Sequence, residues 1–267
     1  MATLLKIHPE NPQPRLITKA AEVLRDGGLI AYPTDSCYAL GCALENKAGI
    51  ERITRIRHLD SKHHFTLMCH DFAQLGQFVI VDNSDFRAIK SMTPGPYTFI
   101  MKATKEVPRR MMHPKKHSVG ARIPQNTTAL ALVEAMGEPI LSSTLLLPGD
   151  EDPLTEADDV MDQIGHDVDV VIESGTPGVV PTSVIDFTGR YTEVARVGAD
   201  VRRLGAQVES ARLTPGELAE GPEEPELEHA LTAPLAVVRP NSRHWVLIGA
   251  LLEDVRRVRE ELLGEDD

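Results

Sequence analysis

Apolar residues gather in short runs along the chain up to about residue 206, and in many of these runs they alternate with polar residues. Runs of roughly four to eight residues with this pattern are typical of strands. The pattern predicts strands at residues 4–7, 29–32, 65–69, 97–103, 119–124, 139–147, 167–174, 182–188 and 192–198.

Between these strands, apolar residues recur every three or four positions, which predicts helices. We expect Asn11 to cap a helix over residues 12–25 and Asn46 to cap a second helix that ends near Arg57, because an Asn side chain can accept a hydrogen bond from the first helical turn. Further helices are predicted at residues 72–78, 85–91, 127–135 and 155–164. Because helices and strands interleave and some strands follow one another directly, we expect a mixed α/β (α+β) fold with a partly antiparallel sheet.

One predicted strand is interrupted by polar residues. Residues 29–32 are typical of a buried strand, and Pro33 should end it, because proline lacks the backbone N–H that a strand ladder needs. Alternation resumes at Cys37, after the polar residues Thr34, Asp35 and Ser36. Taken alone, this turn is most simply an ordinary strand end.

The composition changes after about Ala206. The segment TPGELAEGPEEPELEHALTAP is acidic and rich in Pro and Gly, which predicts a linker without regular structure over residues 208–240 and a C-terminal helix within residues 241–267. From Val208 to Asp267 there are six Arg and fourteen Asp or Glu, a net charge of −8, so residues 1–207 carry −4. We expect the C-terminal helix to dock on this first domain or on a second copy of the chain.

Charge and cysteine content narrow the class of protein. A net charge of −12 over 267 residues argues against a protein that coats nucleic acid or an anionic membrane. The longest late apolar run, WVLIGALL, is too short to span a membrane, and the N-terminus has no signal-like apolar run. Three cysteines without a Cys-x-x-Cys pair predict reduced thiols and a cytoplasmic protein.

Two polar stretches suggest binding chemistry. The run RHLDSKHHFTLMCH holds several His and one Cys, but the spacing fits no standard zinc pattern, so we expect surface or substrate-contacting histidines rather than a metal site. The run KATKEVPRRMMHPKKHSVGAR holds seven Lys or Arg and one Glu; it is either a solvated loop or a rim that binds phosphate or RNA. The residues assigned to RNA binding are Arg109, Arg110, Lys115 and Lys116.

Six short motifs follow one another in order along the chain. They are PTDSCYALG, TPGPYTFIM, VGARIP, PILSSTLLLPG, PTSVIDFT and VARVG. Together they resemble the YrdC/YciO family of threonylcarbamoyl-AMP synthases, and in detail its YciO branch, over about residues 12–205. The resemblance implies a twisted, mostly open mixed sheet with helices on its faces and a basic groove, which the interrupted strand lines.

The resemblance also implies a reaction: L-threonine, bicarbonate and ATP, with Mg²⁺ on the phosphates, form threonylcarbamoyl-AMP and pyrophosphate for tRNA modification. Such a site needs cations and oriented donors more than a nucleophile, so no catalytic side chain is assigned. Arg122 is suited to a bidentate hold on a carboxylate. The residues that correspond to threonine-binding positions are Thr34, His70, Arg122 and Ser183, and those that correspond to nucleotide-binding positions are Arg57, Lys62, Ser142, Thr144 and Arg196.

Several positions depart from the family pattern. Leu59 stands in place of the Arg of Lys-x-Arg-Pro, Leu146 in place of the Asn of Ser-x-Asn, and Asp35 in place of a Glu. Each lost polar contact is worth roughly 1–3 kcal/mol of nucleotide binding. Three readings are therefore open: a weak synthase, a protein that binds tRNA or double-stranded RNA in the same groove, and an interaction protein whose acidic tail recruits a partner or covers the groove.

Overall fold

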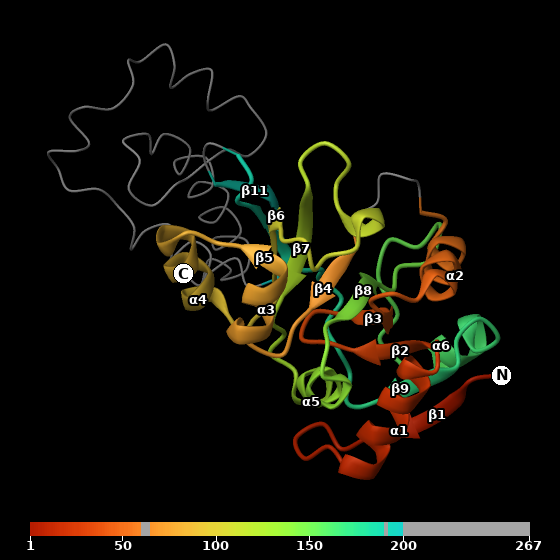
Figure 1. Ribbon diagram of the computed structural model, residues 1–267. Helices are drawn as coiled ribbons and strands as arrows, with labels where there is room; N and C mark the ends of the chain where they lie inside the picture. Colours follow the sequence, from red (N-terminus) through yellow and green to blue (C-terminus); the bar gives the residue numbers. More distant parts are fainter. Residues whose placement is uncertain (60–64, 190–191, 200–267) are drawn as a thin grey trace, which may run out of the picture.

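A computed structural model describes residues 1–59, 65–189 and 192–199 (Figure 1). The helices are α1 (Pro14–Arg25), α2 (Lys47–Arg57), α3 (Phe72–Phe78), α4 (Asn83–Met92), α5 (Thr127–Met136) and α6 (Ala157–Ile164), with a short 3-10 helix η1 (Arg109–Met111). The strands are β1 (Thr3–Lys6), β2 (Leu29–Pro33), β3 (Tyr38–Ala43), β4 (Thr66–Met68), β5 (Val79–Ile80), β6 (Tyr97–Ala103), β7 (Ser118–Arg122), β8 (Ile140–Thr144), β9 (Val170–Glu173), β10 (Ser183–Asp186) and β11 (Glu193–Arg196).

These strands form one twisted mixed sheet in the order β1-β9-β2-β3-β8-β4-β7-β6-β10-β11, and β5 pairs with the end of β6. Parallel pairs (β1–β9, β9–β2, β4–β7 and β6–β10) mix with antiparallel ones such as β2–β3, β3–β8 and β6–β7. The predicted mixed fold with an open, partly antiparallel sheet is confirmed.

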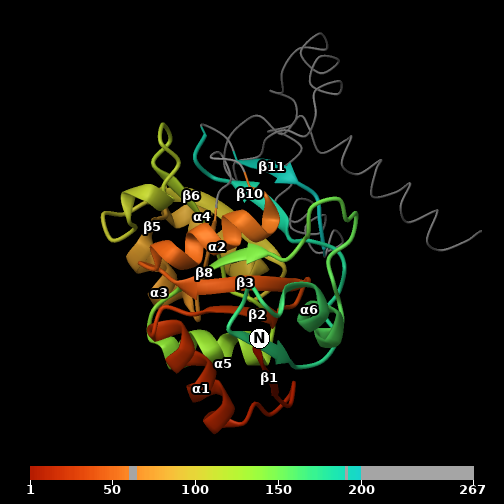
Figure 2. The ribbon, with the colours of Figure 1, turned by 90° about the vertical axis from the view of Figure 1, so that its right-hand side faces the viewer.

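The two faces of the sheet are packed differently. On one face, a large apolar cluster joins the sheet to α2, α3, α4 and α6. On the other face, α1 and α5 lie side by side and bury a second cluster that includes Ile30, Ile140 and Ile172 (Figures 1 and 2).

The cover that α1 and α5 provide ends in the middle of the sheet. In β8, Ile140 belongs to the cluster under these helices, whereas Ser142 lines a cavity. In β4 the same change occurs between Met68 and Thr66. Residues two apart in a strand lie on the same face of the sheet. One face of the sheet therefore carries an apolar core under α1 and α5 and, further along the same strands, a polar cavity.

The observed starts of α1 and α2 can be compared with the capping residues predicted from the sequence. Asn46 caps α2 as predicted, since its Oδ1 accepts a hydrogen bond from the Gly49 N–H at 2.8 Å. The prediction that Asn11 caps the first helix was wrong: α1 begins at Pro14, after Gln13. Proline favours the first helical position, because its φ is already helical and the N–H that it lacks would have no partner there.

Other predictions fall on residues that the structure does not describe. The linker at 208–240, the C-terminal helix at 241–267, and Lys62 with its neighbours His63 and His64 all lie outside the described residues. Within the described residues, no helix is both long and apolar enough to cross a membrane.

Candidate functional site

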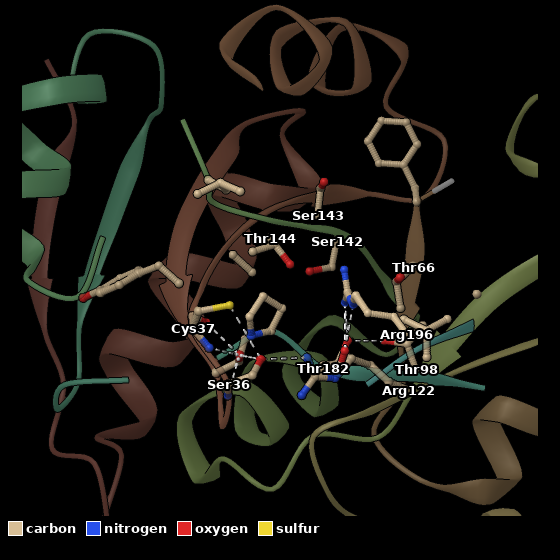
Figure 3. Close-up of a pocket in the computed structure, with 18 of the residues that line it drawn as sticks. Ser36, Cys37, Thr66, Thr98, Arg122, Ser142, Ser143, Thr144, Thr182 and Arg196 are labelled. Carbon is tan, nitrogen blue, oxygen red and sulfur yellow. Dashed lines mark hydrogen bonds between the residues drawn. The ribbon is translucent and has the colours of Figure 1, made fainter. Parts of the chain in front are cut away.

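A cavity of about 210 Å³ lies on the uncovered part of the sheet face (Figure 3). Its floor comes from neighbouring strands, and many of the inward-facing residues carry hydroxyl groups, although the apolar residues Ala39, Ile100 and Val184 also line it. The other floor residues are Thr66, Thr98, Gly120, Ser142, Thr144 and Thr182, the last just before β10. Such a surface offers hydrogen-bond donors and acceptors to a polar ligand.

The polar turn between β2 and β3 forms one wall of the cavity. Thr34 Oγ1 donates to the Cys37 carbonyl at 2.7 Å and accepts from the backbone N–H groups of Ser36 and Cys37 at 3.2 and 3.3 Å. The Thr34 hydroxyl therefore closes the turn on itself, as Ser and Thr commonly do. The turn holds Ser36 and Cys37 against the cavity.

Three arginines from distant parts of the chain line this cavity. Arg57 ends α2, Arg122 ends β7 and Arg196 ends β11. Figure 3 shows Arg122 and Arg196 in the same part of the cavity, close to Thr182. The sheet order explains this convergence, because β7 and β11 lie on the same half of the sheet.

Two of these arginines are held by uncharged acceptors. Arg57 donates from Nη1 to Ser143 Oγ at 2.5 Å and from Nε to the Leu146 carbonyl at 3.3 Å. Arg196 donates from Nε and Nη2 to the Thr182 carbonyl at 3.0 and 2.9 Å. Both guanidinium groups are oriented by the protein and keep their charge.

Arg122 is held differently. Its Nη2 donates to Asp35 in an ion pair whose side chains are both only 7% exposed. Its Nη1 donates to Ser36 Oγ at 3.3 Å. Each terminal nitrogen that was expected to grip a carboxylate therefore already donates one hydrogen bond to the protein.

Among the described residues, the cavity lining includes these three arginines and no carboxylate. Burial lowers the pKa of the Arg57 guanidinium, and the like charge of Arg196 lowers it further, but an arginine remains protonated at neutral pH. Burial raises the pKa of the Cys37 thiol, so Cys37 lines the cavity as a neutral group. The arrangement is suited to binding an anion, which would offset the repulsion between the arginines.

Most of the residues assigned from the motifs meet here. Those that line the cavity are Thr34, Arg57, Arg122, Ser142, Thr144 and Arg196.

Two assigned residues lie elsewhere. Ser183 is fully buried, and its Oγ donates to the Ala199 carbonyl and accepts from the Gly198 N–H, both at 3.0 Å. His70 follows β4 outside the cavity lining, with its ring nitrogens 3.7 Å from the carboxylates of Asp71 and Glu134.

The four basic residues assigned to RNA binding are exposed on the connection between β6 and β7, and none of them lines the cavity. Arg110 donates to the Leu44 carbonyl at 3.5 Å, and Lys116 forms an ion pair with Asp186 at 3.0 Å. Asp186 is the register partner of Ile100, which lines the cavity, so Lys116 lies near its rim.

Sequence reasoning missed several lining residues. They are Ser36, Thr66, Thr98, Ser143 and Thr182. A single hydroxyl in a strand is common and carries little information. The repetition of hydroxyl residues at inward-facing strand positions could have identified Thr66, Thr98 and Thr182, but not Ser36, which lies in the turn, or Ser143, which lies between Ser142 and Thr144 in β8.

Comparisons with known proteins found similar sequences and a similar fold. The family model Sua5_yciO_yrdC, described as telomere recombination, matches residues 22–198. YciO of Escherichia coli strain K12 is 50% identical over 198 residues, which cover 74% of this chain and 96% of YciO. The crystal structure of E. coli YciO matches with a TM-score of 0.73 and covers 76% of this chain and 99% of that structure.

Two further matches carry names that describe an activity or a ligand. A threonylcarbamoyl-AMP synthase of Chromobacterium violaceum is 33% identical over 137 residues, which cover 51% of this chain and 70% of the synthase. The crystal structure of P. abyssi Sua5 complexed with L-threonine matches with a TM-score of 0.71 at 22% identity and covers 83% of this chain and 65% of Sua5. At that identity the likeness shows the fold alone.

Proposed function

The chain belongs to the Sua5/YciO/YrdC family, and on this premise we propose that it is a threonylcarbamoyl-AMP synthase with a weakened hold on ATP. The observation that carries the proposal is a cavity whose described lining residues include several hydroxyl groups and three arginines but no carboxylate. The similarity to a threonylcarbamoyl-AMP synthase of Chromobacterium violaceum supports both the reaction and threonine as the amino-acid substrate.

The reaction brings two anions together. Threonine and bicarbonate form a carbamate and water. A carbamate oxygen then attacks the α-phosphorus of ATP, the bond from phosphorus to the bridging oxygen breaks, and pyrophosphate leaves with the electron pair. Because both partners are negative, the protein contributes most by positioning them and by supplying positive charge.

The three arginines divide naturally between the two substrates. Arg57 and Arg196 bear charges that no described carboxylate neutralises, so they are suited to the phosphates of ATP. Arg122 lies against the turn that contains Ser36 and is suited to the carboxylate of threonine.

The departures from the family pattern explain why we expect a weak hold on ATP. Leu146 lines the cavity with an apolar side chain where the family has an amide, so one polar contact is missing. Leu59 packs against the apolar core rather than lining the cavity. Near the end of α2, Arg57 therefore supplies one positive charge, and residue 59 does not supply a second.

Mg²⁺ enters this proposal as part of the substrate MgATP. Among the described residues, the cavity lining contains no carboxylate, and there is no group of three or more His, Cys, Asp or Glu that could hold a metal ion. These side chains therefore do not fit a resident Mg²⁺ site, and no step is assigned to an ion bound by them.

The test is pyrophosphate release by the purified full chain with ATP, L-threonine, bicarbonate and Mg²⁺. We expect release that depends on threonine and exceeds a heat-killed control, together with calorimetric ATP binding that tightens when threonine is present. No release above the control, at protein concentrations where ATP binding is measurable, would contradict the proposal.

A second function, binding of tRNA or double-stranded RNA, is favoured by the exposed basic connection near the cavity rim. Reversing the charges of Arg109, Arg110, Lys115 and Lys116 should weaken RNA binding and reduce its salt dependence. Equal affinity of the wild type and the reversed variant would reject this function.

A further inference from the structure

Asp35 is the carboxylate that pairs with one of the cavity arginines among the residues that the structure describes. Its Oδ1 accepts from Arg122 Nη2, and its Oδ2 accepts from the Gln125 backbone N–H at 2.9 Å. Asp35 lies in the turn after β2, whereas Arg122 and Gln125 lie at and just beyond the end of β7. The carboxylate therefore ties together two walls of the cavity that are distant in sequence.

The position of Arg122 depends on few contacts. Its Nε is buried and has no hydrogen-bond partner among the described residues, so Asp35 and Ser36 alone orient the guanidinium through its terminal nitrogens. A buried cation without a counter-charge is costly, because it has lost the water that would solvate it. Asp35 supplies that counter-charge with a side chain that is itself buried.

The same pairing changes the electrostatics of the cavity. Asp35 cancels the charge of Arg122, whereas the acceptors of Arg57 and Arg196 among the described residues are uncharged oxygens. Within this part of the chain, the uncompensated charge is therefore concentrated where α2 and β11 meet the cavity. A polyanion should be drawn to Arg57 and Arg196 rather than to Arg122.

Resting on the proposed function, we propose that Asp35 is a positioning residue that keeps the two ends of the cavity distinct. It fixes Arg122 for the amino-acid end, and by neutralising Arg122 it directs phosphate groups to Arg57 and Arg196. This role requires both the negative charge of the Asp35 side chain and its position, and two substitutions test these requirements separately.

Asp35→Asn removes the charge and keeps an oxygen that can accept from Arg122. With one more uncompensated cation, the cavity should bind inorganic pyrophosphate about threefold or more tightly, and the gain should shrink in high salt. A merely structural role predicts the opposite sign, because a damaged site binds every ligand less well.

Asp35→Glu keeps the charge and moves it by one methylene. Pyrophosphate affinity should stay within about twofold of the wild type, because the charge that neutralises Arg122 is kept, whereas L-threonine affinity should change by more than that, because the longer side chain moves the guanidinium that faces the threonine carboxylate. Asp162→Asn, an exposed position on α6, is the matched control for loss of one negative charge and should change neither affinity.

The probes are inorganic pyrophosphate and L-threonine, titrated calorimetrically into the full chain, with thermal unfolding as the check that each variant is folded. Weaker pyrophosphate binding in Asp35→Asn, or equal loss of both ligands in Asp35→Glu, would overturn the inference. Absence of pyrophosphate binding to the wild type at millimolar concentration would also overturn it, because Arg57 and Arg196 would then not form an anion site.

These titrations are independent of the synthase assay. If the wild type releases no pyrophosphate from ATP but Asp35→Asn still binds pyrophosphate more tightly, the proposed function fails and the electrostatic role of Asp35 stands.

Discussion

The covered and uncovered halves of one sheet face can be compared residue by residue. Under α1 and α5, the residues that point to this face are apolar and buried, as with Ile30, Ile140 and Ile172. In the half that forms the cavity, several of the corresponding positions hold hydroxyl groups, as with Thr66 and Thr98. A single strand can contribute residues to both halves. The boundary between the halves is therefore set by how far α1 and α5 cover the sheet.

The difference shows how stability and binding are divided in this fold. Full burial of a large aliphatic side chain is worth about 1.5–3 kcal/mol, so the covered half contributes stability. The uncovered half gives up apolar contact and exposes oriented hydroxyl and guanidinium groups. Tyr32 lies at the boundary: its ring belongs to the covered cluster, while its hydroxyl donates to Ser142 Oγ at 2.9 Å.

We expect the largest effect from a core substitution in the half of the sheet face that α1 and α5 cover. Leu132 of α5 is fully buried, and Leu132→Ala should lower the free energy of unfolding by about 2–5 kcal/mol, because it leaves a cavity between the helix and the sheet. Urea denaturation measures this loss. Leu130→Ala, on the same helix but half-buried, should cost less, and an equal cost would contradict the comparison.

The next effect should appear in the uncovered half and in binding rather than stability. Arg196→Ala should weaken ATP or pyrophosphate binding by about 10-fold to 100-fold, since a charge-assisted hydrogen bond contributes about 1.5–3 kcal/mol. Calorimetry measures the change. Arg87→Ala, an exposed arginine on α4, is the matched control; similar losses in both variants would show that general surface charge, not the cavity, sets the affinity.

A smaller effect is expected at the boundary. Burial raises the pKa of Tyr32 to about 12, so its hydroxyl remains a hydrogen-bond donor at physiological pH. Tyr32→Phe should cost about 1 kcal/mol of unfolding free energy. In a double-mutant cycle with Ser142→Ala, the two losses should not add; full additivity would mean that the contact contributes nothing.

The smallest effect concerns pH at the rim of the cavity. Burial opposes ionisation of Asp186, but hydrogen bonds from Thr188 and the ion pair with Lys116 outweigh it and lower the carboxyl pKa. A carboxyl whose pKa is lower in the folded state stabilises the protein above its unfolded pKa of about 3.9, and this contribution is lost as the pH falls through the folded value.

Asp186→Asn should therefore flatten the acid limb of the stability curve below about pH 4, by at most about 1 kcal/mol, the upper value for a partly exposed ion pair. Unfolding followed as a function of pH measures it. An unchanged acid limb would show that this rim pair does not stabilise the fold.

Much of the cavity could be predicted because its motifs are local. Pro33 ends a strand through its own chemistry, and Thr34 closes the turn through atoms within three residues, so both follow from the sequence. Arg57, Arg122 and Arg196 could be identified from the resemblance to the family motifs, and they do meet in the cavity.

Other features required the tertiary structure. In the motif PTSVIDFT, the choice between Thr182 and Ser183 as the lining residue depends on the strand register, which buries Ser183 against Gly198 and Ala199. A shift of one residue would exchange the two side chains, and periodicity alone does not set that register.

By itself, the sequence determined the alternation of helices and strands, the break after Pro33, and the motifs that carry the basic and hydroxyl groups, because these depend on interactions between near neighbours. Only the tertiary structure decided where the cover of α1 and α5 ends, which strand residues line the cavity, and that Asp35 neutralises Arg122. These depend on contacts between segments far apart in the chain, and the packing of the whole sheet determines which of those segments meet.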